Sequence, residues 1–285
     1  MEAAGSWRRP TSVPYPQVWL TCTGKKPLAN GKIPKFRIQD ATEDMHEDLV
    51  GYMCNIFARD EHLCRTMKIA DDPVSIKEFE EIWRKFLNFN ITVVALLEED
   101  EPSEEKRPRI AGCNILGVTR KTDPKLEPNS VKDEPSEEKR PRIAGCNILG
   151  VNRKTDPKLD PNSFKGEAAR PVMRFIFDFA LKDVDVFEIY GVDEYMSAFG
   201  LFVHPDFRGQ GLAVPLLKAR FPLAKALGIK ATMTFFSPIA AHVASEKAGM
   251  KLIKEAVYDE YEEDGKVLFP NIPSRVLKVM GAVIT

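Results

Sequence analysis

A turn that contains two glycines and an arginine is the part of this sequence best suited to chemistry. The strand-like run Leu201–Val203 is followed by Arg208, Gly209 and Gly211, and an amphipathic helical stretch begins near Ala213. Glycines let an anion approach main-chain N–H groups, the start of a helix leaves such groups without partners, and the arginine adds positive charge. The segment therefore predicts a phosphate-binding turn.

The spacing of this turn distinguishes it from other nucleotide motifs. It has neither the Gly-x-Gly-x-x-Gly order of dinucleotide-binding folds nor the Gly-Lys-Ser/Thr of an ATP-binding loop. Arg208-x-x-Gly211-x-Ala213 instead resembles the acetyl-coenzyme A signature of the GNAT acetyltransferase superfamily. Asp193–Val203, Pro14–Trp19 and Phe36–Asp40 resemble the insect arylalkylamine N-acetyltransferase-like branch, so the resemblance covers most of the chain.

The resemblance implies a mixed α and β fold, the GNAT fold, whose central, mostly antiparallel twisted sheet has a splayed acetyl-coenzyme A cleft and flanking helices. It implies an enzyme that transfers an acetyl group directly from acetyl-coenzyme A to a small primary amine, an arylalkylamine, in a ternary complex. The residues that it places at the donor site are Leu201, Phe202, Val203, Arg208, Gly209, Gln210, Gly211, Leu212 and Ala213.

Glu61 and Ser237 are the residues that the resemblance assigns to catalysis. Asp60-Glu61-His62-Leu63 is similar to an Asp-Glu-Pro-Leu segment of the insect branch, whose glutamate is the general base. Such a base is needed because an ammonium group must lose a proton before it attacks a thioester. His62 replaces the proline, which would loosen the segment or add a second titrating group. Without the resemblance, Glu61 reads as a solvated acid at a helix end.

The acceptor half of the site departs from the family at Ala241. Ser237 matches the first serine of a pair in the insect branch, but Ala241 stands where the second is expected, and His242 or Ser245 would have to substitute for it. A helical histidine beside alanines is more often a packing residue. The N–H that stabilises the developing oxyanion comes, in GNAT folds, from a bulged main chain before the phosphate turn, which maps to Phe202 and Val203.

Two other functions stay open. In the first, the chain is a coenzyme A-binding protein that has lost catalysis. In the second, it is an N-acetyltransferase whose acceptor is a polyamine, an amino acid or a protein amino group. In both alternatives the expected bound molecule is still coenzyme A or its acetyl thioester.

Composition agrees with an ordinary intracellular enzyme. The 285 residues carry 41 Lys and Arg against 42 Asp and Glu, so no charge excess favours nucleic acid or an anionic membrane. No signal-type apolar core or bilayer-length apolar run is found, so we expect a cytoplasmic monomer. Five cysteines without Cys-x-x-Cys and four histidines without His-x-x-x-His indicate neither disulfides nor a metal site.

Helices and strands that position these residues follow from capping and periodicity. Thr42 caps a first helix that leads to Glu61, and Ser75 with Glu78 forms a capping box for a second. Pro222 should kink the helix after the phosphate turn. Strands are predicted at Ile91–Leu97, Ala231–Phe236, Lys251–Tyr261, Val267–Pro270 and Val276–Val283.

A tandem duplication interrupts the middle of the chain. Asp100–Lys132 and Asp133–Lys165 are identical at 30 of 33 positions. The differences are Thr119/Asn152, Glu127/Asp160 and Val131/Phe164. Three explanations of the extra copy stay open: a neutral duplication, a gene-model error, or a new interaction loop. We predict one GNAT domain over residues 36–285 that contains both copies, after an N-terminal extension over residues 1–35 that packs on it.

The duplication supplies two strands for one place in a GNAT sheet. Either Ile110–Val118 or Ile143–Val151 can follow the strand at Ile91–Leu97, after a hairpin loop at Asp100–Arg109. Lengthening that loop by one repeat costs only about 1 kcal/mol of closure entropy, which does not decide between the copies. We predict that the first copy fills the place because its contact is local. Phe164-Lys-Gly-Glu of the second copy then leads into the next helix.

Overall fold

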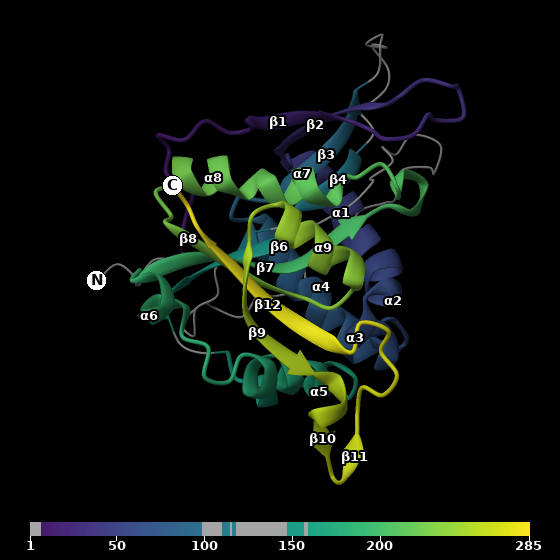
Figure 1. Cartoon of the computed structure of the whole chain (residues 1–285), viewed down its shortest axis with the longest axis vertical. Coiled ribbons are helices and arrows are strands. Elements are labelled where there is room, and N and C mark those ends of the chain that lie inside the picture. Colours follow the sequence, from purple (N-terminus) through teal and green to yellow (C-terminus); the bar gives the residue numbers. More distant parts are fainter. Residues whose placement is uncertain (1–6, 99–109, 115, 118–146, 157–158) are drawn as a thin grey trace.

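One large mixed sheet organises the chain in the computed structural model, which describes residues 7–98, 110–114, 116–117, 147–156 and 159–285. The ten strands follow the order β1-β2-β3-β4-β7-β8-β12-β9, and β6 pairs with β3, β5 and β7. In Figure 1, α7, α8 and α9 lie in front of this sheet and α4 lies behind it, which is the layered arrangement predicted for a GNAT fold.

The strands of this sheet are β1 (Val18–Thr23), β2 (Lys35–Asp40), β3 (Val93–Glu98), β4 (Ile110–Asn114), β5 (Leu116–Gly117), β6 (Asn147–Arg153), β7 (Glu194–Val203), β8 (Ala231–Phe236), β9 (Lys251–Val257) and β12 (Val276–Val283). A separate hairpin joins β10 (Glu262–Glu263) to β11 (Lys266–Val267). The α-helices are α1 (His46–Tyr52), α2 (Ala58–Asp60), α3 (His62–Thr66), α4 (Pro73–Leu87), α5 (Ala169–Arg174), α6 (Val186–Tyr190), α7 (Ala213–Lys218), α8 (Arg220–Ala226) and α9 (Ile239–Lys247).

The centre of the sheet opens between β7 and β8. These two strands are parallel, and their ladder joins Met196 to Thr232 and does not continue toward their carboxyl ends. Most other neighbours are antiparallel, as predicted. Because β7 and β8 stop pairing, their last residues face a gap that side chains from the helices can line.

The helix that precedes the candidate base is interrupted. α1 continues through a π-helical turn at Met53–Phe57 into α2, and the chain turns out of helical geometry at Glu61 (ψ 134°). Thr42 stands at the predicted start of this region, but its side chain makes no capping hydrogen bond. The predicted helix is therefore present, and its end places Glu61 where the sequence indicated.

The second predicted helix starts earlier than its capping box suggests. Asp72, not Ser75, caps α4, since its carboxylate accepts a hydrogen bond from the Val74 N–H at 3.1 Å. Ser75 and Glu78 instead bind the segment before α5: Ser75 Oγ accepts from Ala169 N–H at 2.9 Å, and Glu78 accepts from Gly166 N–H at 3.0 Å. The capping-box prediction is thus wrong: the Ser75 hydroxyl donates to Asp72, and both side chains accept from N–H groups about 90 residues away in the chain.

The helix after the glycine turn is interrupted near Pro222. α7 ends at Lys218 and α8 begins at Arg220. The ring of a proline in a helix clashes with the carbonyl four residues earlier, which for Pro222 is that of Lys218, the last residue of α7. The interruption lies at the expected place, and the kink itself stays a prediction.

The two copies of the duplication share one place in the sheet. Gly112 and Cys113 of the first copy pair with Val203 and Phe202 of β7. The next residue of β7, Leu201, pairs not with Asn114 but with its counterpart in the second copy, Asn147, and β6 continues the ladder to Glu194. The prediction that the first copy alone fills the slot is therefore wrong: the second copy takes over in the same register. The expected loop Asp100–Arg109 and residues 143–146 lie outside the described residues.

The three positions at which the copies differ favour the second copy in the folded chain. The Asn152 side chain forms a hydrogen bond with Tyr195. Asp160 accepts a hydrogen bond from the Asn162 N–H at 2.9 Å, and Phe164 is buried in the core, with its carbonyl accepting from Arg170 Nε. The second copy is therefore the lead-in to α5.

We expect a variant that lacks residues 100–132 to fold and to keep its donor affinity, because the second copy can supply an unbroken strand. A variant that lacks residues 133–165 should be less stable by about 2 kcal/mol, because Val131 would replace the buried Phe164 and leave a cavity. Urea unfolding of both variants measures the difference. Failure of the first variant to fold would show that both copies are structural.

The N-terminal segment joins the main sheet through β1, which pairs with β2 in an antiparallel ladder from Val18 to Thr23. The proposed boundary at residue 35 coincides with the first residue of β2, and the division into extension and domain stays a prediction. No helix in the described part of the chain is long and apolar enough to cross a membrane.

Candidate active site

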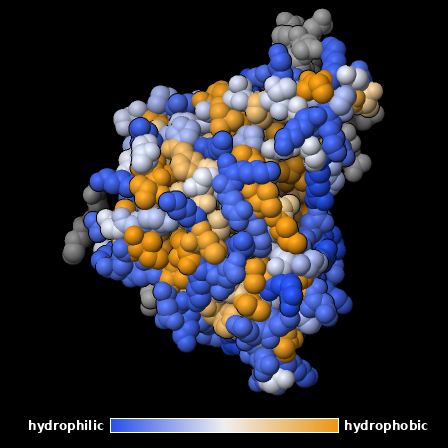
Figure 2. Space-filling view, in the orientation of Figure 1, coloured by the Kyte–Doolittle hydropathy of each residue, from blue (hydrophilic) through white to orange (hydrophobic). Residues whose placement is uncertain are grey.

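A cleft of about 690 Å³ lies between the carboxyl ends of β7 and β8. The glycine turn at Gly209–Gly211 lines it, as do Glu61 and Ser237. Figure 2 shows several apolar patches on one face of the molecule, with hydrophilic side chains between them. The cleft thus brings the predicted donor turn and the predicted catalytic pair into one space.

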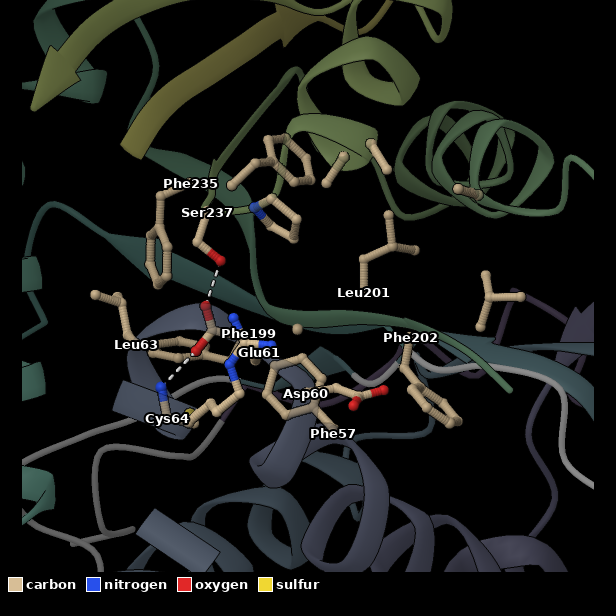
Figure 3. A pocket seen from close by; sticks show the side chains of 18 of the residues that line it. Phe57, Asp60, Glu61, Leu63, Cys64, Phe199, Leu201, Phe202, Phe235 and Ser237 are labelled. Carbon is tan, nitrogen blue, oxygen red and sulfur yellow. Dashed lines mark hydrogen bonds between the residues drawn. The ribbon is translucent and has the colours of Figure 1, made fainter. Parts of the chain in front are cut away.

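Glu61 and Ser237 contact each other inside this cleft (Figure 3). The Ser237 hydroxyl donates a hydrogen bond to Glu61 Oε1, and Ser237 is buried. Glu61 Oε2 accepts from the Cys64 N–H at 2.8 Å and so caps α3. Two hydrogen bonds therefore fix a carboxylate at the point where α2 ends and β8 ends, which is where the sequence placed its general base.

The groups beside Glu61 are neutral near pH 7. Burial lowers the pKa of His62, although the Glu61 charge opposes this effect, and the His62 ring forms a hydrogen bond with the Ser237 main chain. Burial, with the nearby Glu61 charge, raises the pKa of the Cys64 thiol well above its usual value. His62 is thus held in its neutral form and adds no positive charge beside Glu61, and Cys64 is held as an unreactive thiol.

The residues considered as substitutes for the missing serine do not reach the cleft. Ala241 lines it, whereas His242 and Ser245 are buried on α9 and are not among the residues that line the cleft. The His242 ring nitrogen Nε2 lies 2.8 Å from the Phe236 carbonyl, and the Ser245 hydroxyl donates to the His242 carbonyl. Both are packing residues, so the suggestion that either replaces the second serine is wrong. Ser237 is the sole hydroxyl side chain among the described residues that line the cleft.

The glycine turn has the backbone that an anion site needs. Gly209 and Gly211 have φ of 81° and 83°, which residues with a Cβ rarely adopt. A Cβ at Gly211 would lie 2.8 Å from Lys25 Cε, so the open side of the turn is narrow and lined with positive charge. Arg208 pairs with Asp60 and donates through Nε to the Val203 carbonyl at 3.1 Å. These residues fit the pyrophosphate of a coenzyme A thioester.

A β-bulge in β7 faces the cleft. Ile148 pairs with Gly200 and Leu149 with Ala198, so Phe199 is an extra residue on β7. Gly200 has φ of 134°, and a Cβ there would lie 3.1 Å from Phe57 Cζ. The bulge leaves the main chain of Phe199, next to Gly200, outside the regular ladder.

The bulge is not at the predicted position. Phe202 and Val203 pair regularly with β4, so the expectation that their main chain bulges is wrong. The bulge lies about three residues earlier, in the part of β7 that pairs with the second copy. Phe202 and Val203 still line the cleft, and their role in donor binding stays a prediction.

The other wall of the cleft is apolar. Most of the described residues that line the cleft have apolar side chains. The carboxylates among them are Asp60 and Glu61. Asp60 is paired with Arg208, so Glu61 is the carboxylate available to a bound amine. The main apolar contributors are Phe57, Leu63, Phe79, Met173, Phe199 and Phe235. Among the described residues, no group of three or more His, Cys, Asp or Glu side chains has a metal-binding arrangement.

Solved structures show which proteins share this architecture. A yellow fever mosquito protein described as a "putative arylalkylamine N-Acetyltransferase 7" is 26% identical, with a TM-score of 0.75 over 98% of this chain and 100% of its own. The chain has the GNAT fold, and this likeness supports its assignment to the insect arylalkylamine N-acetyltransferase-like branch. It is an enzyme of the N-acetyltransferase class.

More distant GNAT structures have the same fold. Arylalkylamine N-acetyltransferase 2 from Aedes aegypti is 18% identical, with a TM-score of 0.67 over 88% of this chain and 99% of its own. A polyamine N-acetyltransferase of Drosophila melanogaster is 13% identical, with a TM-score of 0.60 over 87% and 99%. No family model matches the sequence, and no curated protein matches it.

The GNAT resemblance did not point to every residue of this site. Phe57 and Phe235 line the acceptor side, but as isolated aromatic residues in apolar runs they are indistinguishable from core residues in sequence. Lys25 reaches the glycine turn from the loop after β1, almost 190 residues earlier in the chain. Two adjacent lysines, Lys25 and Lys26, are a weak sequence signal for an anion site in this loop.

Proposed function

We propose that this protein binds acetyl-coenzyme A and transfers its acetyl group directly to a small primary arylalkylamine. The observation that supports this proposal most is the single cleft that joins the glycine turn to the Glu61–Ser237 pair. The turn fits a pyrophosphate, and the carboxylate fits an ammonium group. A thioester bound between them would lie along the open ends of β7 and β8.

In this proposal Glu61 accepts the proton that the ammonium group of the substrate must lose. The neutral amine then attacks the thioester carbonyl, and the carbon–sulfur bond breaks as the amide forms. The second proton lost from the amine nitrogen balances the proton that the leaving thiolate takes up to give free coenzyme A thiol. A main-chain N–H at the Phe199–Gly200 bulge is the candidate donor to the developing oxyanion, in place of Val203. The Ser237 hydroxyl is the candidate donor to the leaving thiolate.

Direct transfer agrees with the state of the cysteine in the cleft. An acyl-enzyme would require a thiolate, but burial and the Glu61 charge raise the pKa of Cys64. A protonated, buried thiol is a poor nucleophile. The transfer therefore takes place between the two bound substrates.

The apolar wall favours an aromatic amine over a polyamine. A second ammonium group would enter a space lined by Phe79, Met173 and Phe235, where no free carboxylate is available among the described lining residues. Burying an unpaired charge there is costly, whereas an aromatic ring would be favourably buried. The distant likeness to a polyamine enzyme therefore does not extend to the acceptor.

A free-thiol release assay over an amine panel tests the proposal. We expect kcat/KM for phenylethylamine to exceed that for agmatine by about 100-fold, the effect of roughly 3 kcal/mol for an unpaired second charge. A preference for agmatine would contradict the arylalkylamine assignment. Binding of acetyl-coenzyme A without thiol release for any amine would favour the coenzyme A-binding protein that has lost catalysis.

A further inference from the structure

The loop between β1 and β2 is fastened to the glycine turn by one side chain. Gln210 Oε1 accepts hydrogen bonds from the Lys25 and Lys26 N–H groups at 2.9 and 3.0 Å, and Gln210 Nε2 donates to the Lys26 carbonyl at 3.0 Å. Gln210 is buried, at 6% exposure. Its side chain thus faces the loop and not the cleft, and any contact between Gln210 and a phosphate would come from its main chain.

The loop is shaped to fit Gln210 closely. A Cβ at Gly24 would lie 2.6 Å from Gln210 Oε1 and 2.6 Å from Pro34 Cγ, closer than carbon atoms approach. The Gly24 N–H donates to the Pro34 carbonyl at 2.7 Å, which closes the hairpin at this point. Only glycine can occupy this position, so the loop and the turn form one packed unit.

This unit places two lysine side chains over the two glycines. The Lys26 ammonium nitrogen lies 3.1 Å from the Cβ position of Gly209, and Lys25 Cε lies 2.8 Å from that of Gly211. Both lysines are exposed, and Lys25 lines the cleft. Neither forms an ion pair within the described part of the chain, whereas the neighbouring Arg208 already pairs with Asp60. Two uncompensated positive charges therefore border the open side of the anion turn.

We infer that Lys25 and Lys26 bind phosphate groups of the acyl donor, and that Gln210 is the positioning residue that holds them over the turn. This inference rests on the proposed function, because it assigns the side-chain half of the donor site. Ammonium groups recognise phosphate oxygens as point charges with three donors each. A coenzyme A donor carries such oxygens on its pyrophosphate and on its ribose 3′-phosphate.

Titration calorimetry of the full chain with coenzyme A tests the lysines. We expect Lys25→Met and Lys26→Met each to raise Kd about five-fold and the double variant about 25-fold, as for partly exposed charge-assisted contacts. Kd of the double variant should also depend less steeply on salt. Lys251→Met, an exposed lysine of β9 at the opposite edge of the sheet, is the matched control and should leave Kd unchanged.

Dephospho-coenzyme A identifies which phosphate is bound. If the lysines bind the 3′-phosphate, the double variant loses no affinity for dephospho-coenzyme A; if they bind the pyrophosphate, the loss is the same for both probes. Either result supports the inference. A change in coenzyme A Kd below two-fold in the double variant would overturn it, whereas a wild-type chain that binds no coenzyme A would overturn the proposed function itself.

Gln210→Met tests the positioning role, because it keeps the size of the side chain and removes three hydrogen bonds. We expect it to weaken coenzyme A binding about 10-fold in the wild-type background and to have no further effect in the Lys25→Met/Lys26→Met background. A purely structural role would weaken binding equally in both backgrounds. Equal losses would therefore overturn the assignment of Gln210.

Discussion

Glu61→Gln should lower kcat at pH 7 by about 100-fold or more, the range expected when a general base is lost. The carboxamide keeps an oxygen that can accept the Cys64 N–H, so the cap of α3 is retained, but it cannot take a proton from the amine. Coenzyme A affinity should change less than two-fold, because the Glu61 side chain bonds Ser237 and Cys64 rather than the glycine turn. Steady-state kinetics and calorimetry on the same preparation measure both quantities.

The control for this variant is Asp185→Asn. Asp185 caps α6 by accepting from the Phe187 and Glu188 N–H groups at 3.0 and 3.1 Å, so this change also replaces a capping carboxylate by an amide, outside the cleft. It should leave kcat within two-fold of the wild type. Wild-type kcat in Glu61→Gln would remove Glu61 from the mechanism and leave it as a capping residue.

Gly211→Val should weaken coenzyme A binding by about 100-fold, the effect of losing two charge-assisted hydrogen bonds from main-chain N–H groups. The added side chain would occupy the narrow side of the turn, where its Cβ alone comes within 2.8 Å of Lys25 Cε. It would also force a branched residue into a backbone with φ of 83°. Calorimetry gives the affinity and urea unfolding gives the stability.

Gly228→Val separates these two effects. Gly228 follows α8 with φ of 76°, and a Cβ there would meet nothing within 4 Å. The variant therefore carries similar backbone strain, about 1–2 kcal/mol of stability, without a side chain in the anion turn. If both variants bound coenzyme A equally well, the glycine turn would not be the donor site.

Local sequence signals were sufficient for most of the fold. β8 and β12 have the predicted limits, Ala231–Phe236 and Val276–Val283, because each is a β-rich run next to clear turn residues. Glu61 lies in the cleft because the preceding helix has an apolar face, formed in part by Leu49 and Met53, that fixes its orientation. The resemblance to GNAT proteins then placed Ser237 opposite it.

The errors in the prediction involve residues whose partners are distant in sequence. Ser75 and Glu78 match a capping box, yet both accept hydrogen bonds from residues before and within α5. The bulge at Phe199 lies in the ladder between β7 and β6, and Gln210 turns toward a loop almost 190 residues earlier. No local pattern encodes such contacts, since they depend on the packing of complete elements.

The shared register of β4 and β6 gives the sheet a built-in redundancy. Val151 is fully buried on β6, and its counterpart in the first copy is Val118. A slip by one repeat would bring Val118 to the same place without turning any side chain to the wrong face, because the two strand sequences are identical up to this residue. A damaging substitution in one strand can therefore be masked by the other. Phe164 has no such duplicate, because the smaller Val131 stands at its position in the first copy.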